Sequence, residues 1–150
     1  MDRLSRIATL NADYARCIDD DRLEEWPGFF LEHCLYKITT AENVAKGYEA
    51  GLVYADSRAM LQDRVSALRQ ANIYERQRYR HIVGLPAVGE GEATETPFLV
   101  VRIMRDGRMD LFATGRYLDK IVEEGKSLKF AERVVVCDSS RFDTLLAIPL

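Results

Sequence analysis

Two histidines and three cysteines are the residues of this chain that would hold a metal ion or act as nucleophiles. Glu32, His33 and Cys34 stand next to one another, and each is a possible metal ligand. Adjacent residues of an extended segment point to opposite sides, so these three do not converge on one ion. A Rieske cluster needs two cysteines and two histidines, and a mononuclear iron needs two histidines and a carboxylate. The sequence therefore predicts no metal site, no cofactor site and no catalytic residue.

The other histidine, His81, lies among arginines in a strand-like segment, where nearby positive charge favours the neutral imidazole. With Asp56, Asp63 or Tyr79 beside it, His81 would serve as a base, and the chain would then be a stand-alone dehydratase or isomerase. It could equally bond a backbone carbonyl or meet a neighbouring subunit. Because no nucleophile or glycine-rich loop accompanies it, we favour the structural role.

Arginine and tyrosine cluster just before and around this histidine. Both residue types are enriched at protein interfaces, where they give planar hydrogen bonding and rigid contact area. A plain alternative is a strand edge protected by charge. Glu75 and the net charge of −3 count against nucleic acid as the partner. We interpret the cluster as a subunit interface, formed by Tyr74, Arg76, Arg78, Tyr79, Arg80 and His81.

Helices are expected in the first half of the chain. Apolar residues at spacings of three and four predict a helix over 2–19, and a short second helix follows over 22–30. A strand is expected over 35–39, whereas 41–56 gives no clear pattern. Ser57 is a candidate N-cap for a third helix, in which Leu61, Val65 and Leu68 form the buried line to about Asn72.

Strands dominate the second half, where the apolar period changes to two. Asp106-Gly107 predicts a tight hairpin, because such turns need residues that accept positive φ. A second hairpin is expected at 123–126 and a loop at 89–92, while Gly115 indicates a bend or a close backbone approach. Consecutive hairpins imply antiparallel pairing. The expected strands are 78–88, 96–105, 108–119, 127–138 and 143–148.

Helices followed by an antiparallel sheet indicate an α+β fold. Several strands are apolar on both faces in mid-run, as in Phe98–Val101 and Val134–Val136. One face must pack on the helices, and a partner chain would cover the other.

Length and composition predict one soluble domain. The chain has 150 residues, of which 47% are hydrophobic and 30% charged. No apolar run approaches the ~20 residues of a membrane span, and the amphipathic start has no export signal. The three cysteines give no disulfide framework. We therefore expect a cytoplasmic protein with no membrane association.

Longer stretches carry a family likeness. The segments DDRLEEWPGFFLEHCLYKIT, MLQDRVSALRQANIYERQRYRHIVGLP, LFATGRYLDK and ERVVVCDSSRFDTLLAIPL resemble the β (small) subunits of bacterial aromatic-ring-hydroxylating dioxygenases. The similarity covers nearly the whole chain, which makes it more specific than any single motif.

The resemblance implies a cone-shaped fold of the nuclear-transport-factor type, in which N-terminal helices pack on a curved, mostly antiparallel sheet. It implies a hexamer of three large (α) and three small (β) subunits, held together by a trimer of β subunits. The Rieske [2Fe-2S] cluster and the mononuclear Fe(II) are then expected in the large subunit, and a separate reductase supplies electrons from NAD(P)H. The complex would add both atoms of O2 to an aromatic carboxylate, giving a cis-dihydrodiol. No catalytic residue is carried over to this chain, because the family's small subunit has none established.

Overall fold

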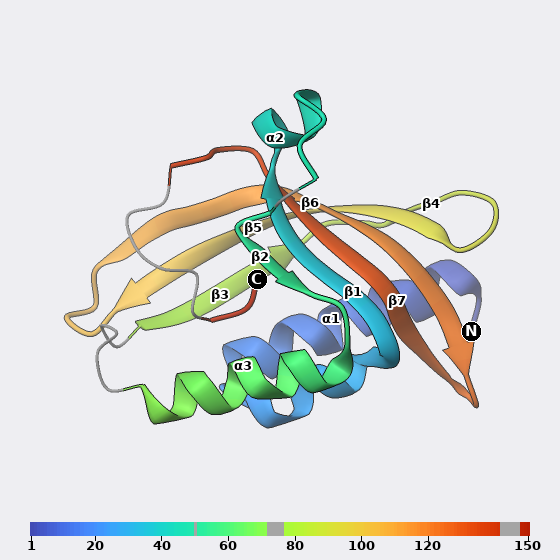
Figure 1. Cartoon of the computed structure of the whole chain (residues 1–150), viewed down its shortest axis with the longest axis horizontal. Coiled ribbons are helices and arrows are strands. Elements are labelled where there is room, and N and C mark those ends of the chain that lie inside the picture. The colour runs from blue at the N-terminus through green and yellow to red at the C-terminus, as the bar shows by residue number, and fades with distance from the viewer. Residues whose placement is uncertain (50, 72–76, 142–147) are drawn as a thin grey trace.

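The computed structural model describes residues 1–49, 51–71, 77–141 and 148–150. Helices come first and a large curved sheet follows, as the sequence predicts (Figure 1). The helical elements are α1 (Arg3–Asp19), the 3-10 helix η1 (Leu23–Phe29), α2 (Ala41–Ala45) and α3 (Arg58–Gln70). The strands are β1 (Phe30–Thr40), β2 (Val53–Ala55), β3 (Gln77–Val83), β4 (Ala87–Val88), β5 (Ala93–Met104), β6 (Met109–Glu124) and β7 (Ser127–Cys137).

Side-chain caps fix where the two long helices begin. The carboxylate of Asp2 accepts a hydrogen bond from the backbone N–H of Ser5 at 2.8 Å, which satisfies one free donor of α1. The predicted cap of α3 is confirmed, because the Ser57 hydroxyl accepts from the N–H of Met60 at 3.2 Å. Its predicted line of Leu61, Val65 and Leu68 is buried as well.

The strand predictions are mostly confirmed, but several bounds differ. The predicted strand 96–105 begins at Ala93, and the predicted strand 108–119 extends to Glu124. The first strand begins at Phe30 rather than 35, and the predicted strand 78–88 is divided into β3 and β4 by residues 84–86. Residues 41–56, which gave no clear pattern, hold α2 and β2. The predicted strand 143–148 lies almost wholly outside the described residues. Both predicted hairpins form, and Gly107 and Gly125 adopt the positive φ values that such turns need (89° and 62°).

The sheet has the strand order β2-β1-β7-β6-β5-β3, and β4 pairs beside β5. Neighbouring strands are antiparallel except β1 and β7, which are parallel. Gly115 marks a close approach, because a Cβ there would lie 2.1 Å from the carbonyl oxygen of Val136 on β7. The strand order leaves β2 and β3 as the two edges of an open sheet.

The sheet has an inner face that packs on the helices and an outer face on the other side. Figure 1 shows α1 and α3 together beneath the inner face. Fully buried aromatic side chains fill the space between, with rings in edge-to-face contact. Along β3, β5 and β6, no helix of the described residues covers the outer face. The aromatic core consists of Tyr14, Trp26, Phe30, Tyr36, Tyr117 and Phe130.

Candidate subunit interface

The predicted interface cluster divides between the two faces of the sheet. Side chains alternate along β3, so Tyr79 and His81 point inward and are buried, whereas Arg78 and Arg80 are exposed. Tyr74 and Arg76 lie outside the described residues. Because Tyr79 and His81 already pack inside this chain, the interface hypothesis now concerns Arg78 and Arg80.

The two arginines belong to a larger patch on the outer face, which we call the arginine patch. Strand pairing forms three rows across the sheet, and two of them join an arginine of β3, an aliphatic residue of β5 and an apolar residue of β6. At its end, the β5–β6 turn adds Arg105 and Arg108, both exposed. Large apolar side chains are unusually open here, with 68% of Met109 and 64% of Leu111 exposed. The rows are Arg78–Ile103–Met109, Arg80–Val101–Leu111 and Ile82–Leu99–Thr114.

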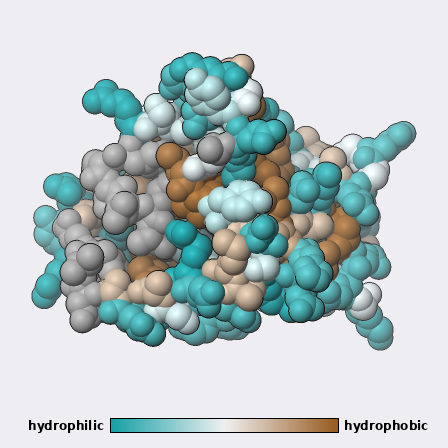
Figure 2. All heavy atoms as spheres, viewed as in Figure 1, coloured by the Kyte–Doolittle hydropathy of each residue, from teal (hydrophilic) through white to brown (hydrophobic). Residues whose placement is uncertain are grey.

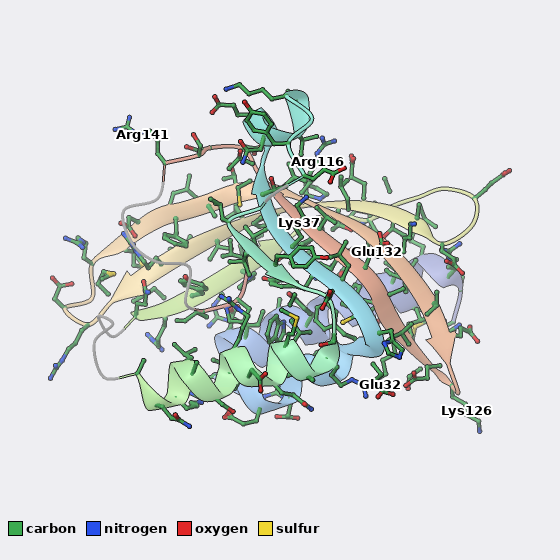
Figure 3. The ribbon with its side chains drawn as sticks, viewed as in Figure 1. Glu32, Lys37, Arg116, Lys126, Glu132 and Arg141 are labelled. Carbon is green, nitrogen blue, oxygen red and sulfur yellow. The ribbon has the colours of Figure 1, made fainter. Side chains whose placement is uncertain are left out.

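The outer face continues beyond this patch toward β7 and β1. A shallow hollow of about 530 Å³ lies over β5, β6 and β7, and its apolar floor includes Leu118 and Val134. Figure 3 shows Lys37, Arg116 and Glu132 over strands β1, β6 and β7. Hydrophobic atoms gather over the middle and right of the view in Figure 2, surrounded by hydrophilic atoms. Apolar surface bordered by charge is typical of a protein interface.

His81 has a carboxylate partner that the sequence did not reveal. Its ring Nδ1 lies 2.7 Å from Oδ1 of Asp19, and its backbone N–H donates to Oδ2 of the same carboxylate at 2.8 Å. Both side chains are buried, and the other ring nitrogen, Nε2, has no hydrogen-bond partner. The predicted acidic neighbours Asp56 and Asp63 are wrong, since Asp19 at the end of α1 occupies that position. The contact ties helix α1 to the edge strand β3.

A buried ion pair lies at the centre of the inner face. The guanidinium of Arg133 on β7 donates two hydrogen bonds of 2.9 Å to Asp119 on β6, and a third to Asn11 on α1. It also lies 3.8 Å from the ring centre of Tyr117 and 4.0 Å from that of Phe130. Burial alone would lower the pKa of Arg133, but Asp119 holds that pKa above its ordinary range, so the guanidinium stays charged. The cone interior is therefore filled by protein side chains in this region.

The possible metal ligands do not meet. In β1, Glu32 and His33 are exposed while Cys34 is buried, because an irregularity in the pairing with β7 falls between Phe30 and Leu35. Across the described residues no three His, Cys, Asp or Glu side chains lie close enough to hold a metal ion. Burial also raises the pKa of the Cys17 and Cys137 thiols, to about 11 and about 12. These side chains do not fit a Rieske cluster or an iron centre.

None of the helices in the described ranges is long and apolar enough to cross a membrane. A curved sheet over N-terminal helices, with an outer face that no helix of the described residues covers along β3, β5 and β6, defines an α+β cone fold.

The family follows from comparison with known proteins. The model of the ring hydroxylating beta subunit family matches residues 13–144, and the chain belongs to this family. It is 52% identical over 149 residues to subunit beta 1 of the terminal oxygenase component of terephthalate 1,2-dioxygenase from Comamonas sp, covering 97% of each chain. It is 38% identical over 148 residues to the anthranilate 1,2-dioxygenase small subunit of Burkholderia cepacia, covering 96% of this chain and 92% of that one.

A solved structure agrees with both the fold and the family. The protein, from Novosphingobium aromaticivorans, is described as the beta subunit of an aromatic-ring-hydroxylating dioxygenase. It superposes with a TM-score of 0.88 at 38% identity, covering 98% of this chain and 96% of that one. The predicted cone-shaped α+β fold and the predicted family are thereby confirmed. A small subunit of such a multi-component oxygenase works beside a large oxygenase subunit.

Proposed function

We propose that this chain is the structural β subunit of a terephthalate 1,2-dioxygenase, or of an oxygenase for a closely related aromatic carboxylate. The observation that carries the substrate class is 52% identity to the terephthalate enzyme's β subunit over almost the whole of both chains. The large subunit would add both atoms of O2 to the ring and form a cis-dihydrodiol. This chain would contribute contact surface rather than chemistry.

The positions of the two histidines support the assignment of the chemistry to the large subunit. Its two histidines lie apart, one exposed on β1 and one paired with Asp19, so they cannot share an iron. The Rieske [2Fe-2S] cluster and the mononuclear Fe(II) would therefore reside in the large subunit. A separate reductase would bring electrons from NAD(P)H. We place the complex in the cytoplasm, with no role for nucleic acid.

The assembly that we propose has three large and three small subunits, with the small subunits forming a trimer. The arginine patch supports a contact role, because it combines exposed apolar side chains with exposed arginines. Arg78 and Arg80 are the residues on which we expect a neighbouring subunit to pack.

Reconstitution tests this function. The purified chain should be colourless and inactive with terephthalate, NAD(P)H and the reductase. Mixing it with its large subunit should restore dihydroxylation, measured as consumption of terephthalate and formation of a cis-dihydrodiol. A large subunit that is fully active without this chain would refute the structural role, and a reconstituted complex that dihydroxylates no aromatic carboxylate would refute the substrate assignment.

The buried Asp19–His81 pair supports a second candidate function, that of a stand-alone dehydratase or isomerase. A carboxylate that accepts from Nδ1–H would leave Nε2 free to accept a proton, as a general base requires. Against it, the side chain of His81 is completely buried. Replacing His81 with Asn separates the two functions, because a base would be lost while oxygenase assembly would persist. An isolated wild-type chain that turns over no hydroxylated aromatic substrate would remove this candidate.

A further inference from the structure

Residues 148–150 lie inside the cone, between helix α1 and the sheet (Figure 1). Leu150 is completely buried, and Pro149 beside it is buried as well. Within the described part of the chain, these three residues belong to no helix and pair with no strand. They lie in the aromatic core as a bound peptide would, held by side chains rather than by a ladder of backbone hydrogen bonds.

Two tyrosine hydroxyls bind the backbone of Leu150. Tyr14 on α1 donates to its carbonyl oxygen at 2.8 Å, and Tyr36 on β1 donates to the same oxygen at 3.1 Å. The N–H of Leu150 donates to the Tyr36 hydroxyl at 3.2 Å. Both tyrosine rings are buried in edge-to-face contact with Phe30, so the hydroxyls are held in position before anything binds them. The cone thus recognises an N–H and a carbonyl on one α-carbon.

The cone around Leu150 has polar groups that this residue does not use. The hydroxyl of Tyr117 and the indole Nε1 of Trp26 are buried, and neither has a hydrogen-bond partner among the described residues. Their rings stand beside the two binding tyrosines, with ring centres 6.2 Å apart for Tyr117 and Tyr14 and 5.1 Å apart for Trp26 and Tyr36. Aromatic walls with a few buried polar groups are typical of a small-molecule site, whereas the polar groups of a completed core are normally paired.

The contacts of Leu150 define the ligand that such a site would take. A branched aliphatic group fits among the aromatic rings, and an adjacent amide N–H and carbonyl meet the two hydroxyls. A charged ligand is disfavoured, because Arg133 in the cone is already neutralised by Asp119 and burying a further charge is costly. The matching class is therefore a neutral N-acylated amino acid with a branched aliphatic side chain.

We propose that residues 148–150 are an internal ligand that closes a binding site inside the cone, and that a neutral N-acylated branched amino acid takes their place when the segment is displaced. The chain then has a small-molecule site on the inner face of the sheet, separate from the outer face that a neighbouring subunit would cover. The site lies within one chain, so it depends neither on the large subunit nor on the proposed function.

Trp26 reports on this site, because it is the single tryptophan of the chain and its ring contacts that of Tyr36. Leu150→Lys in the full chain should drive the segment out of the cone, since an ammonium without a counter-charge is unstable there. The fluorescence of Trp26 should then shift to longer wavelength as water enters. Leu85→Lys is the matched control, because 73% of Leu85 is exposed, and it should leave the spectrum unchanged. Circular dichroism should show both variants folded.

Titration of the Leu150→Lys chain with N-acetyl-leucine amide is the decisive measurement. The probe should return the Trp26 emission toward that of the wild-type chain, whereas N-acetyl-glycine amide, which lacks the aliphatic group, should bind at least about 10-fold more weakly. Adding Tyr36→Phe should weaken binding of the leucine probe about 10-fold, because both hydrogen bonds to that hydroxyl are lost. Tyr117→Phe removes a neighbouring hydroxyl that Leu150 does not use, and it should leave binding unchanged.

The wild-type chain should not bind the probe at the same concentrations, because its own segment fills the site. Equal binding by the wild-type chain would place the probe elsewhere and overturn the proposal. Loss of the fold in Leu150→Lys would make residue 150 part of the core rather than a displaceable ligand. An unshifted Trp26 spectrum, or an opened cone that binds the probe equally well with and without the Tyr36 hydroxyl, would also overturn it.

Discussion

The two faces of the sheet use the same residue types in opposite ways. On the inner face, Arg133 is wholly buried, pairs with Asp119 and is enclosed by aromatic rings. On the outer face, Arg78 and Arg80 are exposed beside aliphatic residues with no helix over them. An arginine inside the cone fixes how the elements of one chain pack. An arginine on the outer face is available to a second chain, so the difference separates what specifies the fold from what offers contact.

The largest expected effect comes from breaking the inner ion pair. Asp119→Ala leaves the Arg133 guanidinium buried without its counter-charge, and we expect the free energy of unfolding to fall by about 3–5 kcal/mol. Urea denaturation followed by tryptophan fluorescence measures it. Asp13→Ala, which breaks the exposed pair with Arg16, is the control and should change the free energy by less than about 0.5 kcal/mol. Equal losses of unfolding free energy in the two variants would mean that the buried ion pair stabilises the fold no more than an exposed one.

A smaller effect is expected where β6 approaches β7. Gly115→Ala places a Cβ against the carbonyl oxygen of Val136, so the backbone must move, and we expect a loss of about 1–3 kcal/mol in the free energy of unfolding. Thermal denaturation measures it. Gly89→Ala is the control, because no atom lies within 4 Å of the added Cβ. A fully stable Gly115→Ala variant would show that the sheet can relax at this point.

On the outer face, a substitution should change assembly and spare the fold. Arg80→Ala removes a side chain that is 60% exposed and whose guanidinium lies 3.9 Å from the Asp19 carboxylate, and we expect the free energy of unfolding to fall by less than about 1 kcal/mol. Gel filtration or native mass spectrometry at limiting concentration should show weaker assembly of the complex. Arg16→Ala on α1 is the control with equal loss of charge. An unchanged oligomer would refute the interface assignment.

The smallest effect concerns the cysteines, whose thiols should not react while the chain is folded. Burial holds the pKa of Cys17 at about 11, so at pH 8 only roughly one thiol in a thousand is ionised there. Because the pKa values of these thiols are raised in the folded chain, their ionisation favours the unfolded chain. The free energy of unfolding should therefore fall as pH rises above the ordinary thiol pKa of about 8.5. Labelling with a disulfide reagent should be slow in buffer and complete in urea. Rapid labelling of the native chain would show that the core opens readily.

Local signals in the sequence predicted the elements well. Ser57 and Asp106-Gly107 act through hydrogen bonds and backbone angles within a few residues, so their effects can be read without the rest of the fold. The apolar runs on both faces likewise predicted an uncovered face. The function and the cone shape of the fold were predicted from the resemblance to the β-subunit family and not from local signals.

Long-range partners could not be predicted in the same way. Asp19 and His81 are 62 residues apart, and nothing in the local pattern of either identifies the other. Charged side chains are usually exposed, yet Asp119 alternates in phase with the buried Tyr117 and Arg133 with the buried Val135, so both point inward. For the candidate interface, the Arg-Tyr cluster is visible in the sequence, but the burial of Tyr79 and His81 depends on which face of β3 meets α1.

The parallel pairing of β1 with β7 has a consequence for how the chain folds. Phe30 pairs with Phe130, so this contact closes a loop of about 100 residues, whereas the β5–β6 and β6–β7 hairpins close within a few. Contacts between distant residues form late and slow the reaction, so we expect the C-terminal hairpins to form before β1 joins them. During synthesis, α1 and β1 leave the ribosome first and must wait for β7 before their apolar side chains are covered. We therefore expect chaperones to bind the nascent chain within its first third, where α1 and β1 lie.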